Sequence, residues 1–170
     1  MRDAPYRAEK PIALVGLMGA GKSTVGRRLA ARLGLPFADS DAEIEAEAGL
    51  TIAAIFERFG EAEFRARERA VVARLVAGGP AVIATGGGAF IDEGTRALIL
   101  ARCTAVWLDG DAGTLARRVA RQGGRPLLAG EDPAAALARL AETRGPYYAE
   151  AHLRVRSDEA AVETIIEALR

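Results

Sequence analysis

Short apolar runs alternate along the chain with longer segments that have helical periodicity. Apolar runs without polar alternation, lying between helical segments, are typical of buried parallel strands. They predict strands at residues 12–15, 37–39, 82–84, 105–108 and 153–155. The intervening segments are rich in Ala, Leu, Glu and Arg, which favour helices, and they predict helices at residues 22–33, 41–48, 61–77, 92–100, 111–121, 133–142 and 160–169.

The alternation of strands and helices predicts an α/β fold in three layers, with a five-stranded parallel sheet flanked by helices. The chain has 170 residues, half of them hydrophobic, which is enough for one substantial core. We therefore expect a single domain over residues 1–170. Residues 121–133 combine glycine, proline and charge, and this composition predicts a mobile loop.

Composition and charge narrow the possible partners. Lys plus Arg total 23 and Asp plus Glu total 23, so no global field attracts nucleic acid or an anionic membrane, and we expect neither as a partner. Cys103, the single cysteine, cannot form an intramolecular disulfide, and its apolar surroundings predict a packed thiol. Residues 1–10 lack an apolar signal core, and no later run is long enough to span a bilayer. These features favour a cytoplasmic location.

A glycine-rich motif follows the first predicted strand. Residues 16–23 read Gly-Leu-Met-Gly-Ala-Gly-Lys-Ser, which is the full G-x-x-x-x-G-K-[ST] pattern between a strand and a helix. Glycines let successive amides face one anion, and the start of the helix adds its positive dipole end. The alternative, a turn that binds nothing, is disfavoured by the strand before it and the helix after it. The motif predicts a cradle for the phosphates of ATP, formed by Gly19, Ala20, Gly21, Lys22, Ser23 and Thr24.

Within this cradle we expect Lys22 to act catalytically, because its ammonium group can reach the β and γ phosphates. The Ser23 hydroxyl is the predicted ligand of a bridging Mg²⁺. Asp39 and Asp41 follow the second predicted strand, where strand ends face the ligand crevice. One carboxylate suits Mg²⁺, and the other can accept hydrogen bonds from a polyol or take its proton. In an alternative interpretation, Asp41 only caps the helix that begins at Ala42.

Further motifs follow in order: EFRARE at residues 63–68, TGGGA at 85–89, RPLL at 125–128 and RGPYY at 144–148. With the phosphate loop and the aspartate pair, the chain over residues 12–148 resembles shikimate kinase. The resemblance implies an ATP-dependent phosphotransferase with an alcohol acceptor. Such an enzyme would phosphorylate the 3-hydroxyl of shikimate and give shikimate 3-phosphate, in the chorismate pathway to aromatic amino acids. It also implies a three-layer P-loop kinase fold with a substrate-binding helical region over residues 40–70 and a lid over 119–132.

The resemblance implies roles for the acceptor-side residues. Asp41 would bind the ring hydroxyls and is the candidate base, while Asp39 would sit behind Mg²⁺. Arg65 and Arg144 would clamp the substrate carboxylate, a task that suits the planar guanidinium fork. The substrate would also contact a run of three glycines, whose missing side chains let backbone N–H groups approach closely: Gly86, Gly87 and Gly88. A flexible turn is the alternative for this run.

On the nucleotide side, the resemblance implies that Arg118 lies against adenine and that the lid residue Arg125 acts catalytically on the phosphates. A solvated surface arginine is the alternative for each. Glu68 is spaced to hold Arg65 through a same-face pair. The chain departs from the family after Val155, where Arg156-Ser157 is not followed by the basic residue that some relatives place near adenine. Core packing is the alternative to substrate contact for Phe56 and Phe64, and we interpret His152 as structural or superficial.

Two other functions remain open from the sequence. One is a different P-loop small-molecule kinase, acting on gluconate or on a nucleoside monophosphate. The other is a nucleotide-binding regulatory module without transferase activity. ATP and shikimate are the expected partners, and we expect a monomer.

Overall fold

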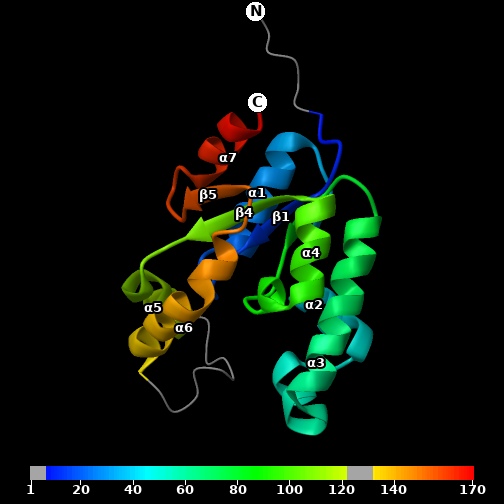
Figure 1. Cartoon of the computed structure of the whole chain (residues 1–170), viewed down its shortest axis with the longest axis vertical. Helices are drawn as coiled ribbons and strands as arrows, with labels where there is room; N and C mark the ends of the chain where they lie inside the picture. Colours follow the sequence, from blue (N-terminus) through cyan, green and yellow to red (C-terminus); the bar gives the residue numbers. More distant parts are fainter. Residues whose placement is uncertain (1–6, 122–131) are drawn as a thin grey trace, which may run out of the picture.

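The computed structural model of the chain describes residues 7–121 and 132–170. Five strands form one parallel sheet with the order β2-β3-β1-β4-β5 (Figure 1). Their bounds are β1 Ile12–Val15, β2 Phe37–Asp39, β3 Val82–Ala84, β4 Thr104–Asp109 and β5 Leu153–Arg156. The predicted α/β class and five-stranded parallel sheet are therefore confirmed, and three of the five strands have the predicted limits.

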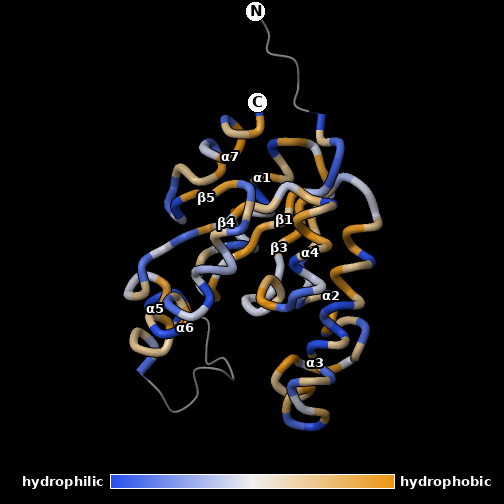
Figure 2. The backbone as a smooth tube through the Cα atoms, in the orientation of Figure 1, coloured by the Kyte–Doolittle hydropathy of each residue, from blue (hydrophilic) through white to orange (hydrophobic). Residues whose placement is uncertain are grey.

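Helices flank the sheet, with α1 packed against α7 and α3 packed against α4 (Figure 1). The helices are α1 Lys22–Leu33, α2 Ser40–Ala48, α3 Ile52–Ala77, α4 Glu93–Arg102, α5 Ala112–Arg121, α6 Pro133–Tyr148 and α7 Ala161–Leu169, with a short 3₁₀ helix, η1, at Ala89–Ile91. Figure 2 shows apolar residues concentrated along the strands. All residues of β1 and β3 are buried, as expected for central strands covered on both faces.

Helices α2 and α3 form a unit with its own apolar cluster. Ile44, Ile55, Phe64 and Val71 are buried together beneath these two helices, apart from the main core of the sheet. Helix α3 is kinked at Gly60, which has φ 83° and ψ 174°. The sequence predicted only the part after the kink. The earlier part begins after Thr51, whose hydroxyl accepts a hydrogen bond from the Ala54 amide.

Other boundaries also differ from the prediction. Helix α6 continues past residue 142 to Tyr148 with Pro146 inside it, and the Ala149 amide closes its end on the Gly145 carbonyl. Helix α2 begins one residue earlier than predicted, because Asp39 caps it. The 3₁₀ helix η1 was not predicted. Within residues 7–121 and 132–170, none of the helices combines the length and apolar character that a transmembrane segment needs.

Two residues that the sequence placed outside the site, Cys103 and His152, have the surroundings it indicated. Cys103 is fully buried, and burial raises the pKa of its thiol to about 11, which fits a packed side chain rather than a nucleophile. The Nδ1 atom of His152 accepts a hydrogen bond of 2.9 Å from the Ala105 amide, so this histidine joins the segment before β5 to β4. Its role is structural.

The contact between α1 and β2 gives a test of the packing. A Cβ atom at Gly26 would lie 2.6 Å from Cε2 of Phe37 and 3.3 Å from a methyl carbon of Leu14. We expect Gly26→Ala to lower the free energy of unfolding by about 1–3 kcal/mol, because the core has no room for the methyl group. The measurement is urea denaturation followed by circular dichroism.

Gly94 of α4 provides the matched control, since it is also a helical glycine and is exposed. Outside its own stretch of helix and its chain neighbours, a Cβ atom there would meet, among the described residues, only Oδ2 of Asp92, at an ordinary contact distance of 3.6 Å. Gly94→Ala is expected to raise the free energy of unfolding by about 0.5–1 kcal/mol, through helix propensity alone. Equal effects of the two substitutions would contradict the packing argument.

Candidate active site

The phosphate loop joins β1 to α1 and depends on glycine at defined positions. Gly19 and Gly21 have φ values of 82° and 84°, in the left-handed region that other residues avoid. A Cβ atom would lie 2.6 Å from the Leu108 carbonyl oxygen at Gly16 and 2.8 Å from the Leu115 carbonyl oxygen at Gly19. Gly21 is the N-cap of α1 and has no side chain to cover its first amides. The loop is therefore built to leave N–H groups for an anion.

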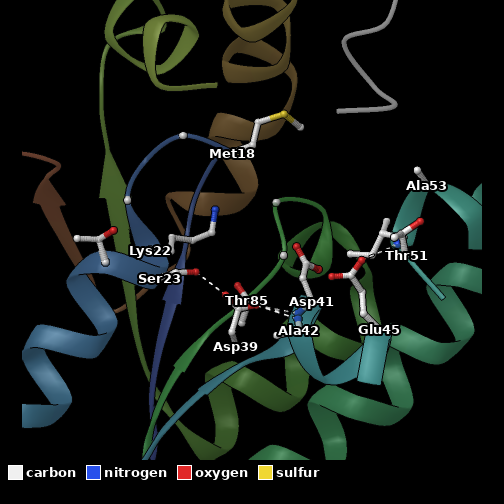
Figure 3. Close-up of a pocket in the computed structure, with 16 residues that line it drawn as sticks. Met18, Lys22, Ser23, Asp39, Asp41, Ala42, Glu45, Thr51, Ala53 and Thr85 are labelled. Atoms are coloured by element: carbon white, nitrogen blue, oxygen red, sulfur yellow. Dashed lines mark hydrogen bonds between the residues drawn. The ribbon is translucent and has the colours of Figure 1, made fainter. Parts of the chain in front are cut away.

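Lys22 and Ser23 occupy the first turn of α1 (Figure 3). The Lys22 side chain is mostly buried, and its Nζ atom donates to the carbonyl oxygens of Gly16 and Leu17 at 2.7 and 2.9 Å. The Ser23 hydroxyl donates to Oδ2 of Asp39. A cation and a hydroxyl–carboxylate pair thus lie at the mouth of the loop, beside the amides of α1.

The two aspartates have different surroundings. Oδ1 of Asp39 accepts hydrogen bonds from the amides of Asp41 and Ala42 at 3.0 and 3.2 Å. Asp39 therefore caps α2, and the alternative in which Asp41 is the cap is wrong. Asp41 lies in the first turn of α2 with Oδ1 against residues 86–88, which we call the glycine segment, only 2.6 Å from where a Cβ atom of Gly86 would be.

Residues 86–88 follow β3 and lie against four charged side chains, those of Asp41, Glu68, Arg65 and Arg144. A Cβ atom at Gly86 would also be 3.0 Å from Oε2 of Glu68, and one at Gly88 would be 2.5 Å from both Nη atoms of Arg65. One at Gly87 would be 3.6 Å from Nη1 of Arg144. The sequence explained these glycines by access to their amides. The structure adds that side chains at Gly86 and Gly88 would displace the site's charged groups.

Arg65 reaches this segment from α3, and Arg144 reaches it from α6. Nη1 of Arg65 donates to Oε1 of Glu68 at 2.8 Å, which confirms the predicted same-face pair. Nη1 of Arg144 donates to the Gly87 carbonyl oxygen at 3.1 Å. Two guanidinium groups from different helices therefore lie against consecutive residues of one glycine segment.

Glu68 is a buried carboxylate with only 1% of its surface exposed. Its Oε2 atom has no hydrogen-bond partner among the described residues. Burial raises the pKa of Glu68, and the nearby positive charge of Arg65 acts in the opposite direction. An unsatisfied carboxylate oxygen thus faces the space between Arg65 and the glycine segment.

Arg118 lies on the other side of the phosphate loop, away from the glycine segment. Its Nη1 atom donates to the Gly19 carbonyl oxygen at 3.1 Å and to the Ser157 hydroxyl at 2.9 Å. The Ser157 hydroxyl in turn donates to the Ala20 carbonyl oxygen. Arg118 is therefore fixed to the loop, both directly and through Ser157, and is not a loosely solvated arginine. The sequence did not indicate this role for Ser157. Arg125 and most of the predicted lid lie outside the described residues.

Two neighbouring cavities are lined by many of the predicted site residues, although Ala20, Arg118 and Arg144 line neither of them. The larger is a cleft of about 450 Å³ between the phosphate loop and the start of α2 (Figure 3). The smaller, of about 60 Å³, lies between Arg65, Glu68 and the glycine segment. The lining residues that both share are Met18, Asp41, Ile52, Gly86 and Gly87. The two cavities therefore adjoin, as a transfer between two bound molecules requires.

Several lining residues were not predicted. The larger cleft also contains Glu45, whose Oε2 accepts a hydrogen bond from the Ile52 amide, and Thr85, whose hydroxyl donates to the Leu14 carbonyl. Phe56 and Phe64 line the smaller cavity with ring centroids 4.8 Å apart, and Phe64 also belongs to the α2–α3 core. Core packing and cavity lining therefore coexist at these two positions.

The oxygen atoms near the loop fit a magnesium ion. Ser23 and Asp39 present a hydroxyl and a carboxylate side by side in the larger cleft. No group of three or more His, Cys, Asp or Glu side chains that could hold a metal occurs among the described residues. Mg²⁺ commonly binds through one or two protein oxygens together with phosphates and water, so a sparse set of ligands suits it.

Comparison with known proteins agrees with this geometry. The shikimate kinase family model matches residues 18–170. A shikimate kinase of Caulobacter vibrioides is 55% identical over 171 residues, which cover 98% of this chain and 85% of that protein. The chain belongs to the shikimate kinase family.

Solved structures support the same family. A structure described as shikimate kinase from Acinetobacter baumannii in complex with shikimate matches with a TM-score of 0.89 and 40% identity, covering 96% of this chain and 92% of that one. A gluconokinase from Sinorhizobium meliloti matches with a TM-score of 0.60 at 23% identity, covering 96% of this chain and 91% of its own, and this likeness shows a shared fold alone. The predicted P-loop kinase fold and family are thus confirmed.

The buried carboxylate of Glu68 predicts a pH-dependent stability. Because burial raises its pKa, the folded protein keeps the Glu68 proton to a higher pH than the unfolded chain does. Unfolding between these two pKa values releases a proton, so rising pH favours unfolding. The stabilising contribution of the protonated Glu68 side chain to the free energy of unfolding is fully present below its pKa in the unfolded chain, about 4.3. It is lost as the pH rises through the pKa of Glu68 in the folded protein. Relative to Glu68→Gln, the wild type should therefore lose stability from pH 4 to pH 8.

Urea denaturation of both proteins at several pH values measures this difference. Glu63→Gln is the control, because Glu63 lies on the same helix with 46% of its side chain exposed and pairs with Arg67 at 3.1 Å. This control removes a carboxylate charge that is not buried, so its effect on stability should not show the same dependence on pH. A constant difference between wild type and Glu68→Gln across the pH range would contradict the assigned burial effect.

Proposed function

We propose that this member of the shikimate kinase family transfers the γ-phosphoryl group of ATP to the 3-hydroxyl of shikimate, giving shikimate 3-phosphate for the synthesis of chorismate and aromatic amino acids. One observation carries the choice of acceptor. The guanidinium groups of Arg65 and Arg144 lie against neighbouring glycines, with the Asp41 carboxylate beside the same segment. Such a site suits a small acceptor that has both a carboxylate and hydroxyl groups.

The donor binds along the phosphate loop in this proposal. Residues 19–24 hold the phosphates with backbone amides, while Lys22 turns from the carbonyl oxygens of Gly16 and Leu17 toward the β and γ phosphates. Arg118, fixed beside the loop, lies against the base. Arg125 retains its predicted role at the phosphates, which rests on the family resemblance.

Ser23 and Asp39 are the proposed residues that hold Mg²⁺, with Asp39 acting through water. The bound ion would offset the phosphate charge during transfer. Asp39 keeps its Oδ1 atom on the helix cap, which leaves Oδ2 and the Ser23 hydroxyl directed at each other beside the loop. This arrangement supports a metal position next to the phosphates.

On the acceptor side, Arg65 and Arg144 bind the carboxylate and so fix the orientation of the ring. Asp41 accepts a hydrogen bond from a ring hydroxyl and receives its proton as the phosphoryl group moves. Phosphoryl transfer depends mainly on positioning and on charge stabilisation, so a weak base in the correct place is sufficient. The cavities shared at Met18, Asp41 and Gly87 support direct transfer between donor and acceptor.

We also propose that the chain acts as a monomeric, single-domain kinase over residues 1–170 in the cytoplasm. The residues that carry the proposed chemistry come from one chain, which supports a monomer. The packed thiol of Cys103 is compatible with a reducing compartment.

The acceptor is tested by measuring ADP release with shikimate, gluconate and AMP in parallel. We expect kcat/KM for shikimate to exceed that for the other two by at least about a hundredfold. AMP has no carboxylate for the two arginines, and gluconate, which has a carboxylate and hydroxyl groups, is an open chain that does not hold them in the fixed geometry of a ring. Preferential turnover of gluconate or AMP would replace the proposed acceptor. Calorimetric binding of ATP without binding of shikimate would instead favour a regulatory module.

Asp41→Asn tests the role of the second carboxylate. The amide keeps the size of the side chain but cannot take a proton at neutral pH, so we expect kcat to fall by about a hundredfold or more. The KM for ATP should remain unchanged, because Asp41 faces the acceptor. Thermal melting of the variant checks that it is folded. Near wild-type turnover with unchanged shikimate affinity would show that the assignment is wrong.

A further inference from the structure

Tyr148, the last residue of α6, is a buried tyrosine whose hydroxyl the proposed mechanism does not use. Only 1% of its surface is exposed, and its ring lies 6.4 Å from the ring of Phe90 and 5.8 Å from that of Trp107. A phenylalanine would pack against these rings equally well. The hydroxyl therefore needs a separate explanation, which its hydrogen bond provides.

The Tyr148 hydroxyl donates to the Gly87 carbonyl oxygen at 2.5 Å. The same carbonyl oxygen accepts from Nη1 of Arg144 at 3.1 Å. Arg144 and Tyr148 are four residues apart on α6, so both side chains leave the same face of the helix. Burial raises the pKa of Tyr148 to about 12, so the phenol remains a donor throughout the physiological range.

The end of α6 is also anchored from its other side. Arg96 of α4 donates through Nη1 to the Phe90 and Ile91 carbonyl oxygens at 3.3 and 3.1 Å, and its Nε atom pairs with Glu150 at 3.1 Å. Its guanidinium lies 4.8 Å from the Tyr147 ring centroid. These contacts join the end of α6 to η1, which directly follows the glycine segment. Tyr148 is therefore held in register with Gly87.

The two donors to the Gly87 carbonyl oxygen, Arg144 and Tyr148, would respond differently to an anion in the site. Arg144 must turn at least part of its guanidinium toward the anion, which weakens its bond to the carbonyl oxygen. Gly87 is half-buried and lines both cavities, so an acceptor bound there would shield its carbonyl oxygen from water. A shielded carbonyl that loses its only donor is costly, whereas one that keeps a second donor is not. Tyr148 can remain in place, because its ring is packed in the core.

We propose that Tyr148 is a positioning residue for recognition of the acceptor carboxylate. By donating to the Gly87 carbonyl oxygen, it releases Arg144 to bind the carboxylate without leaving that carbonyl unpaired beneath the bound acceptor. This inference rests on the proposed function, because it concerns the acidic acceptor of the same site. It assigns a role to a hydroxyl that touches neither substrate.

The test compares shikimate with its methyl ester in wild type, Tyr148→Phe and Tyr147→Phe. The ester has the same ring and hydroxyl groups but no negative charge for Arg144. In Tyr148→Phe we expect kcat/KM for shikimate to fall by about five- to tenfold, as for loss of one hydrogen bond. The value for the ester should change by less than about twofold, and KM for ATP should be unchanged.

Tyr147→Phe is the matched control, since Tyr147 is on the same turn with 38% of its surface exposed. It should leave the ratio of the two kcat/KM values at the wild-type level. This ratio does not depend on the fraction of enzyme that is folded, so a less stable Tyr148→Phe preparation remains informative. An unchanged ratio in Tyr148→Phe, or an equal loss with both acceptors, would overturn the inference. Failure of the wild type to phosphorylate shikimate would instead overturn the proposed function.

Discussion

The acceptor side of the cleft depends on the close approach of charged side chains to a backbone without side chains. Asp41 and Glu68 converge on Gly86, and the Arg65 guanidinium covers Gly88. A methyl group at either glycine would displace a charged group. The positions of these charges therefore depend on the absence of side chains at Gly86 and Gly88. Burial raises the pKa of Glu68 and the Asp41 charge acts in the same direction, while Arg65 opposes both through its 2.8 Å bond to Glu68.

The topology of the sheet explains why the donor and acceptor groups meet. Strands β2, β3 and β1 are neighbours and run in the same direction, so the segments after them emerge at one edge. The segment after β1 is the phosphate loop, that after β3 is the glycine segment, and that after β2 carries the aspartates. Direct contact follows from this order, since a Cβ atom at Gly87 would be 3.5 Å from the Met18 amide nitrogen. Arg65 and Arg144 then enter from helices outside this edge.

Much of this arrangement could be predicted from sequence, because its signals are local. The limits of β1, α1, β2 and β3 were correct, and the Arg65–Glu68 pair followed from helical spacing. Other features could not be predicted, because their causes lie far along the chain. Tyr148 bonds Gly87 across 61 residues, and Ser157 bonds Ala20 across 137, so no neighbouring residues indicate either contact. The part of α3 before Gly60 was missed because its packing partners lie in α2 and beyond the kink.

A one-residue difference in the start of α2 separates the tasks of its two aspartates. Because the helix begins at Ser40, Asp39 is the cap and uses Oδ1 on two amides, while Oδ2 accepts from Ser23. Asp39 is thus bound to the helix start and to the phosphate loop at once, which suits a fixed position near a metal. Asp41, the second residue of the same helix, does not cap it and is directed at the glycine segment instead. Had the helix begun at Ala42, the Asp41 carboxylate would have been held by the backbone. The capping geometry therefore determines which aspartate faces the glycine segment.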